Sequence, residues 1–265
     1  MTEQTQETVS VQFAIGIGDG KFNATAIVPA GQTNLTQILP VIQALDDSLI
    51  GGIAAQSAAE GRPVSCRAGC GACCRQLVPV SIFEAEALAA WIRTLPESRQ
   101  QELAGRFHRA LLKLAAAGLI DRMVSEDWHA GTETHRQLAL DYLYERVDCP
   151  FLEDESCSIY PIRPLACREY LVTSEPEHCY DPGTRQSVPL ILPLYFSRIL
   201  NGMGGEVEHS ERCWIPLPFL FAWMESGAQP GERIAGTGPE VLYEFVRRMT
   251  VAQLPAEITD PSPEA

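Results

Sequence analysis

Cysteines cluster in one short stretch of this chain. Four thiols fall within nine residues, at Cys66, Cys70, Cys73 and Cys74. Thiolates are soft ligands that bind zinc, copper(I) and iron–sulfur clusters, and ordinary core packing does not require such a density. The intervening glycines allow the backbone to bend so that sulfurs three and four residues apart can face one ion. The stretch therefore predicts a metal-binding loop.

Two of these cysteines, Cys73 and Cys74, are adjacent. Neighbouring side chains in extended or loop backbone point to different sides, so we do not expect both to bind the same ion. One of them is expected to have a second role. A four-thiolate zinc site or a cubane cluster would then need further ligands from elsewhere in the chain.

A second set of cysteines supplies such ligands, at Cys149, Cys157, Cys167 and Cys179. The set contains two short motifs, CPFL at 149–152 and C-x-I-Y-x-x-R-P-x-x-C-R at 157–168. The helix expected before residue 149 ends about where the first loop could face it. We infer the pairing of the two sets from the need for ligands and not from periodicity.

Taken together, these motifs resemble the YkgJ family of cysteine-cluster proteins, which are described as zinc- or iron-chelating domains. The resemblance covers about residues 66–170 and departs from the family pattern only in the first gap, which has three residues instead of two. It implies metal ligands drawn from Cys66, Cys70, Cys73, Cys74, Cys149, Cys157, Cys167 and Cys179. Of these, Cys70, Cys73 or Cys74, Cys149, Cys157 and Cys167 are expected to converge on the centre.

The nature of the centre stays open between zinc and an iron–sulfur cluster. Structural zinc sites with four thiolates hold loops in small domains. A cluster, most simply [4Fe-4S], is favoured by the many thiolates and by the absence of histidine at ligand spacing. The flagellin lysine N-methylases have a similar cysteine pattern, and this resemblance implies an iron–sulfur cluster. Complete disulfide pairing is excluded because the ninth cysteine, Cys213, makes the count odd.

A radical S-adenosylmethionine enzyme is a further alternative, because residues 66–73 have that superfamily's C-x3-C-x2-C spacing. Its chemistry sits on a barrel of alternating strands and helices, whereas this chain is predicted to be mostly helical. The fold expectation therefore disfavours this alternative.

Three side chains near Cys167 could support a metal centre. Arg163 and Arg168 could pair with carboxylates such as Glu153 or Asp154, or they could offset the negative charge of a thiolate-bound centre. Tyr160 could be a packed aromatic residue or a hydrogen-bond donor to sulfur. Both interpretations of each residue are open from the sequence.

Composition limits the class of protein. The chain has 265 residues, of which 46% are hydrophobic, so a core of ordinary size is expected. The net charge is −14 and there are two lysines, which disfavours nucleic acid or an anionic membrane as partner.

The polar N-terminus lacks the features of a secretory signal, so we expect a cytoplasmic protein. The longest apolar run expected is 214–224. The expected partner is a metal ion or cluster, and a protein partner is left open.

Periodicity predicts a mainly α, irregular helical domain with an N-terminal β-hairpin at 9–29. Helices are expected at 35–58, at 82–94 behind a Ser81/Glu84 capping box, from Ser98 to Gly118, and at 133–146. Further helices are expected at 188–200, 215–224 and 239–249. Prolines predict an irregular loop at 149–170 that is held by ligation. Residues 9–252 are expected to form one domain with its cysteine core at 66–180, between disordered tails at 1–8 and 253–265.

Three functions fit these features. The first is a metal- or cluster-binding protein that acts in storage, delivery or sensing. The second is a cluster-dependent enzyme, such as a group transferase resembling the protein lysine N-methylases. The third is a structural metal site combined with a partner-binding face at 214–224. A concave pocket beside the centre would favour the enzyme.

Overall fold

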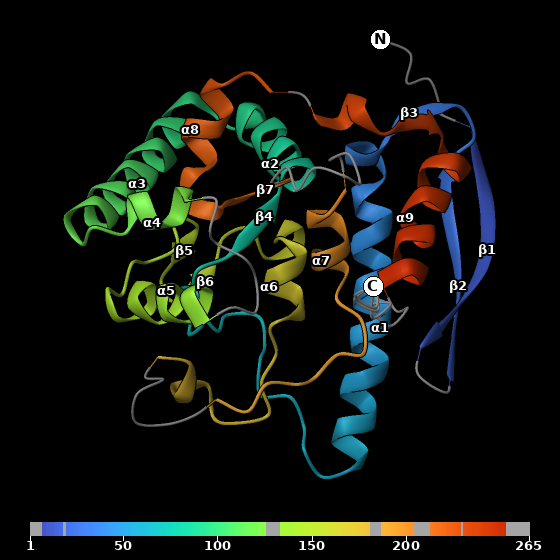
Figure 1. The fold of residues 1–265 in the computed structure, drawn as a ribbon, viewed down its shortest axis with the longest axis horizontal. Coiled ribbons are helices and arrows are strands. Elements are labelled where there is room, and N and C mark those ends of the chain that lie inside the picture. Colours follow the sequence, from blue (N-terminus) through green and yellow to red (C-terminus); the bar gives the residue numbers. More distant parts are fainter. Residues whose placement is uncertain are drawn as a thin grey trace, which may run out of the picture.

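The computed structural model describes residues 7–17, 20–125, 133–180, 187–203, 213–228 and 230–252. Within these residues the chain is mainly helical, and its strands form four separate two-stranded sheets (Figure 1). The α-helices are α1 Leu35–Ala59, α2 Ile82–Thr94, α3 Glu97–Ala116, α4 Ile120–Val124, α5 Glu133–Tyr144, α6 Leu165–Glu169, α7 Phe196–Asn201, α8 Leu220–Glu225 and α9 Gly238–Ala252. The strands are β1 Thr8–Ile17, β2 Gly20–Pro29, β3 Gln32–Asn34, β4 Pro79–Ser81, β5 Leu152–Glu153, β6 Ser156–Cys157, β7 Trp214–Pro216 and β8 Ala235–Thr237. The mainly α class is confirmed, and the described sheets contain no barrel of alternating strands and helices.

The predicted N-terminal hairpin is confirmed. Strands β1 and β2 pair antiparallel from Thr8 opposite Pro29 to Ile17 opposite Gly20. Its turn at 18–19 lies outside the described residues, as do residues 1–6 and 253–265 of the two predicted tails. The N-terminal tail is shorter than predicted, because Thr8 already belongs to β1.

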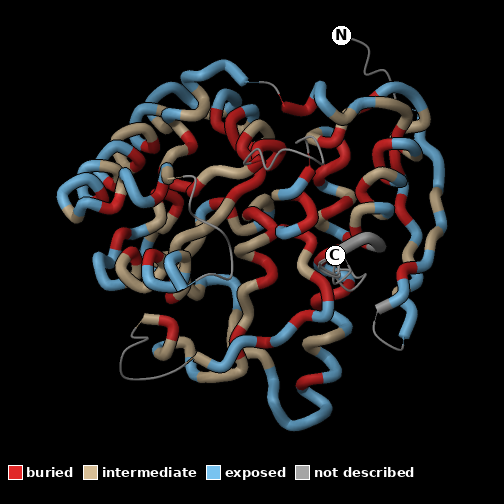
Figure 2. Tube along the Cα trace, viewed as in Figure 1, coloured by how far each residue is buried: buried red, intermediate tan, exposed pale blue. Residues whose placement is uncertain are grey.

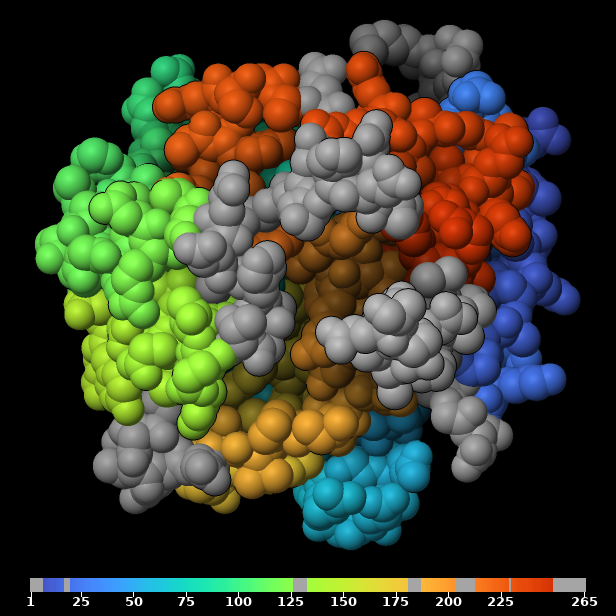
Figure 3. All heavy atoms as spheres, viewed as in Figure 1, coloured from blue at the N-terminus to red at the C-terminus, as the bar shows by residue number. Residues whose placement is uncertain are grey.

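Helix α1 is the central element of the main core. Its buried residues, among them Leu35, Ile38 and Ile42, pack with Phe83 of α2 and with Phe196 and Phe245 of α7 and α9. Figure 2 shows this burial fading toward the C-terminal end of α1, and on the face drawn in Figure 3 that end reaches the surface as the cyan atoms at the bottom. The core therefore forms around one long helix.

Helix α1 also has a property that the sequence patterns did not predict. By length and composition, α1 is apolar enough to cross a membrane, and it is the one such helix among the described residues. The longest apolar run was expected at 214–224 instead. Buried helices of a protein core pass the same test, and the apolar side chains of α1 pack against the protein's own helices.

A capping box begins α2 as predicted. The Ser81 hydroxyl accepts a hydrogen bond from the Glu84 amide at 3.1 Å, and the Ser81 amide donates to Glu84 Oε2 at 3.0 Å. The other carboxylate oxygen, Oε1, accepts from the Leu165 amide at 2.7 Å, at the start of α6. Glu84 is fully buried, and burial raises its pKa. One carboxylate thus joins the N-termini of α2 and α6.

Replacing Ser81 by alanine should lower the free energy of unfolding by about 1–2 kcal/mol, because the Glu84 amide loses its acceptor. Urea unfolding followed by circular dichroism measures the change. Ser98→Ala is the matched control. The structure begins α3 at Glu97 with no side-chain cap, so the predicted role of Ser98 is wrong and its substitution should cost almost nothing. Equal losses in the two variants would contradict the assignment.

Prolines shorten several predicted helices. Residues 188–195 are largely extended, and α7 begins only at Phe196, because Pro189 and Pro193 interrupt the predicted helix at 188–200. The predicted helix at 215–224 is instead strand β7, a 3-10 turn and the short helix α8. Its residues Leu217 and Leu220 are buried against α2 and α3, so these two side chains belong to the core, and a partner-binding face at 214–224 stays a prediction.

The segment at 149–170 is more regular than predicted. It forms the hairpin β5–β6, a 3-10 turn at Tyr160–Ile162 and the short helix α6. Its prolines occupy positions that regular structure tolerates, since Pro161 lies in the first turn of the 3-10 helix and Pro164 is the N-cap of α6. Hydrogen bonds within the chain therefore contribute to the order of this segment.

Candidate metal centre

The two cysteine segments meet through their backbones. The Cys149 amide donates to the Cys74 carbonyl at 2.7 Å, which fastens the second segment directly to the end of the first. Gly71 lies against the β5–β6 turn so closely that a Cβ there would be 2.6 Å from the Glu155 carbonyl oxygen. Gly69 has φ +85°, a conformation that favours glycine. The glycines thus serve both the bend that we predicted and the contact between segments.

A third segment closes the other side of the cysteine loop. The Val172 amide donates to Cys66 Sγ at 3.3 Å, and the Ser65 amide donates to the Val172 carbonyl at 3.0 Å. The Ser65 hydroxyl also donates to the Ser174 carbonyl at 2.6 Å. These bonds bring the chain after α6, and with it Cys179, alongside the first loop.

Arg75 strengthens the contact between the two cysteine segments, a role that the sequence did not predict. Its guanidinium pairs with Asp148 at 2.8 Å and with Glu155 at 2.6 Å, and it lies 5.2 Å from the centre of the Tyr180 ring. Tyr180 also donates to Glu155 at 2.8 Å. No motif indicated this role, because its partners lie about 75 to 105 residues further along the chain.

Seven thiols surround Cys73 in two groups. The first thiol group comprises Cys66, Cys70 and Cys179, and the second thiol group comprises Cys74, Cys149, Cys157 and Cys167. Members of each group interact electrostatically with one another, and Cys73 interacts with both groups. The packing is divided in the same way. The first group packs with Ala72 and Val172, whereas Cys149 and Cys157 pack against a different apolar cluster that includes Phe151.

Burial keeps most of these thiols protonated. Desolvation raises the pKa of Cys149 and of Cys179 to about 12 in each case, and it raises the pKa of Cys167 strongly. Cys73 is the exception, because a hydrogen bond from Cys74 lowers its pKa to about 7, and the same bond raises the pKa of Cys74. Bringing the other thiols to the thiolate form requires a nearby cation, which a bound metal would provide.

Arg163 is the side chain that faces the thiols. Its guanidinium lies 3.8 Å from the centre of the Tyr160 ring and donates to the Tyr160 carbonyl at 3.1 Å. Its charge lowers the pKa values of Cys66, Cys73 and Cys157, against the effect of burial on Cys66 and Cys157. Of the two interpretations of Arg163, the structure favours the one that offsets thiolate charge. Tyr160 is a packed aromatic residue beneath it.

Arg168 has a structural role instead. It is buried and pairs with Asp47 of α1 at 2.7 Å, while it also donates to the carbonyls of Pro161 at 2.5 Å and Arg163 at 3.0 Å. The predicted partners were wrong, because Glu153 pairs with Arg99 and Arg106 of α3. Arg168 therefore fixes the backbone that presents Arg163.

The thiol donors are of the type that soft metals prefer, although they are not already arranged around one ion. All nine cysteines are free, and eight of them are Cys73 and the members of the two thiol groups, whereas Cys213 is buried in the main core. Among the described residues, no three His, Cys, Asp or Glu side chains already stand where they could hold one ion. The chemistry of the donors nevertheless fits thiolate ligation of a soft metal.

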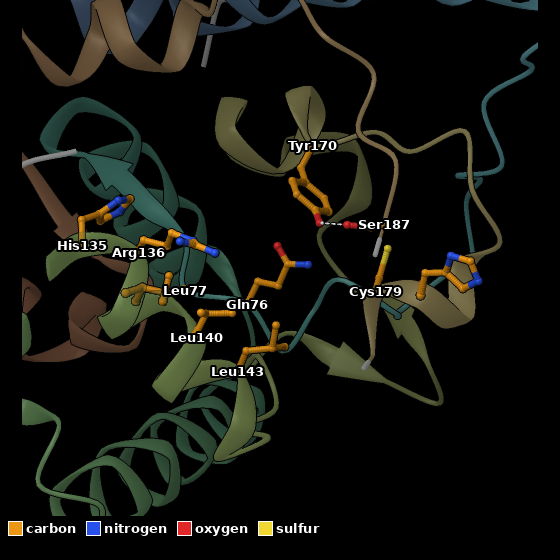
Figure 4. Close-up of a pocket in the computed structure, with 11 residues that line it drawn as sticks. Gln76, Leu77, His135, Arg136, Leu140, Leu143, Tyr170, Cys179 and Ser187 are labelled. Carbon is orange, nitrogen blue, oxygen red and sulfur yellow. Dashed lines mark hydrogen bonds between the residues drawn. The ribbon is translucent and has the colours of Figure 1, made fainter. Parts of the chain in front are cut away.

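A cavity of about 360 Å³ lies beside the first thiol group. Figure 4 shows Cys179 at one side of it, Arg136 at the other, and Tyr170 above Gln76. His178, which was expected to face solvent, also lines this cavity. No sequence pattern predicted the cavity, because its residues come from the cysteine loop, α5 and the segment after α6.

Comparison with known proteins agrees with this geometry. Residues 65–184 match the family model CxxCxxCC, described as a "Putative zinc- or iron-chelating domain". Neither the curated proteins nor the solved structures gave a match. The matched range contains Gly71, Arg75, Arg163 and all eight cysteines around the junction. Residues 65–184, which hold the whole of this candidate centre, thus match the model of the zinc- or iron-chelating group that the sequence motifs resemble.

Proposed function

We propose that this protein binds a metal centre, zinc or an iron–sulfur cluster, through the eight clustered cysteines, and that it acts in metal or cluster handling or sensing. The observation that carries the proposal is the gathering of seven thiols around Cys73 from segments up to about 110 residues apart. Bound metal would supply the positive charge that makes buried thiolates stable at neutral pH.

The grouping of the thiols supports two four-cysteine sites instead of one. Cys73 would complete the first thiol group, and the second thiol group already has four members. The adjacent residues Cys73 and Cys74 would then serve different sites, which agrees with the geometric expectation that neighbours do not share an ion. Each site would have the four thiolates that structural zinc and cubane clusters both use.

Metal analysis of protein purified without oxygen tests this proposal. Iron, zinc and acid-labile sulfide are quantified together with an absorption spectrum. Two filled zinc sites would give about two zinc ions per chain and no colour. Cubane clusters would give about four irons and four sulfides per site, with a broad band near about 400 nm. Protein that retains neither metal in stoichiometric amount would overturn the proposal.

Three substitutions test the division into two sites. Cys179→Ser should remove the metal of the first site, and Cys149→Ser should remove that of the second, so each variant keeps about half of the wild-type metal. Cys213→Ala is the matched control, because this thiol is buried away from both groups and its loss should leave metal content unchanged. If either serine variant loses all of its metal while it stays folded by circular dichroism, a single shared site is the better description.

An enzyme remains the second candidate, because the cavity beside Cys179 is the concave pocket that catalysis would need. Its lining does not favour a lysine side chain as substrate. An ammonium group is recognised by carboxylates or aromatic faces; the described lining offers the Tyr170 ring but no Asp or Glu, and it places the cation Arg136 in the same cavity. Methyl transfer from a methyl donor to free lysine, measured with the metal-loaded protein, would establish the enzyme function.

A further inference from the structure

The cavity next to Cys179 is formed by three parts of the chain. Helix α5 contributes one side, Gln76 and Leu77 after the cysteine loop lie in the middle, and Tyr170, Cys179 and Ser187 contribute the opposite side (Figure 4). Its volume of about 360 Å³ lies within the range of pockets that hold small organic ligands. The cavity is therefore large enough to receive a molecule and not merely water.

The cavity lining contains a cationic side chain, whereas the whole protein has a net negative charge. The chain has 34 acidic and 20 basic residues, yet no Asp or Glu of the described ranges lines this cavity, while Arg136 and two histidines do. Arg136 pairs with Glu133 at a long distance of 3.4 Å, and both side chains are exposed. Burial lowers the pKa of His135, as does the charge of nearby Arg198. Arg136 is thus the cation at the α5 end of the cavity, since the lowered pKa of His135 favours its neutral form.

The remaining lining is apolar on one side and rich in hydrogen-bond donors on the other. Leu77, Leu140 and Leu143 form a continuous apolar surface in the lower part of Figure 4. Above them, the Tyr170 hydroxyl lies 3.4 Å from that of Ser187. The Gln76 side-chain amide points into the same space, and it makes no hydrogen bond to another residue in the described part of the chain. A ligand with an anionic end and an apolar body would satisfy both sides.

We propose that this cavity binds a small organic carboxylate with an apolar body. The carboxylate pairs with the Arg136 guanidinium and accepts from Gln76, while the body lies on Leu77, Leu140 and Leu143 toward Cys179. Guanidinium groups suit this task, because their fixed donors match the two oxygens of a carboxylate. The inference goes beyond the proposed function, since none of these contacts requires a bound metal.

Titration calorimetry with sodium octanoate tests the site on the full-length protein as purified. We expect saturable binding that weakens about tenfold in Arg136→Gln, because one charge-assisted contact is lost. Arg109→Gln is the matched control, since Arg109 is an exposed arginine on α3 that does not line the cavity, and its affinity should equal that of the wild type. Octylamine, which has the same chain and the opposite charge, should not bind.

Chain length tests the apolar half of the site. Affinity should rise about threefold to fourfold for each methylene added between butanoate and octanoate, as expected when methylenes leave water. Leu140→Asn should flatten this series without abolishing the preference for an anion. Absence of saturable binding, equal binding of octylamine, or unchanged affinity in Arg136→Gln would each overturn the inference. Metal content measured on the same samples separates this result from the test of the proposed function.

Discussion

Replacing Gly71 by alanine should separate the two cysteine segments and remove metal from the second site. The new Cβ would lie 2.6 Å from the Glu155 carbonyl oxygen and 2.7 Å from Leu152 Cδ1, and the first of these is backbone that cannot rotate away. The β5–β6 turn must therefore move, and the bond from Cys149 to the Cys74 carbonyl moves with it. We expect a loss of about 3 kcal/mol in the free energy of unfolding.

The measurements for Gly71→Ala are urea unfolding and the metal content of the purified protein. Gly51→Ala supplies the matched control. Gly51 lies within α1, a Cβ there would meet nothing within 4 Å, and alanine favours helix by up to about 1 kcal/mol. The control should be at least as stable as the wild type and should keep its metal. A Gly71→Ala protein with wild-type stability and metal content would show that the close packing of the two segments is dispensable.

The second large effect concerns Asp46, whose replacement by asparagine should stabilise the protein above neutral pH. Asp46 is fully buried in α1, and neither carboxylate oxygen has a hydrogen-bond partner among the described residues. Its pKa is raised from 3.8 to about 9, mainly by burial and also by the charges of Glu169 on α6 and of the neighbouring Asp47, whereas Arg168 lowers it. At neutral pH the folded protein therefore holds Asp46 as a neutral acid.

The sign of the pH dependence follows from this shift. The folded state binds the Asp46 proton more tightly than the unfolded state does, so its contribution is complete below pH 3.8 and is lost as pH rises toward about 9. Each unit of pKa difference corresponds to about 1.4 kcal/mol. Glu169, whose pKa burial raises to about 7, adds a change of the same sign. Wild-type stability should fall by several kilocalories per mole between pH 5 and pH 8.

Urea unfolding at pH 5 and at pH 8 tests this expectation. Asp46→Asn should lose much less stability between the two conditions than the wild type, because it has no proton to lose at this position. Asp154→Asn is the control, since Asp154 is exposed in the β5–β6 turn at φ +48°, a conformation that asparagine tolerates. If the wild type and Asp46→Asn show parallel pH profiles, the assignment of the neutral acid is wrong.

Local elements were predicted well wherever adjacent residues decide them. The hairpin, α1, the capped helix α2, α5 and α9 all depend on alternation, helical spacing or a cap within a few residues. Gly118 follows the end of α3 and has the left-handed conformation, φ +68°, that suits glycine after a helix. The errors lie at 149–170, 188–200 and 215–224, where prolines and tertiary contacts override a short apolar pattern.

The cysteine sequence by itself determined which donors this protein offers, because thiol density and motif spacing are readable without any structure. The sequence also predicted that the two cysteine sets pair, but it could not divide them. Only the tertiary structure decided how the thiols divide into two groups around Cys73. It also decided the ion pairs of Arg75 and the cavity at Cys179. Each depends on residues that are far apart in the chain and meet through backbone bonds, close glycine packing and charge pairs, and such contacts leave no periodic signal.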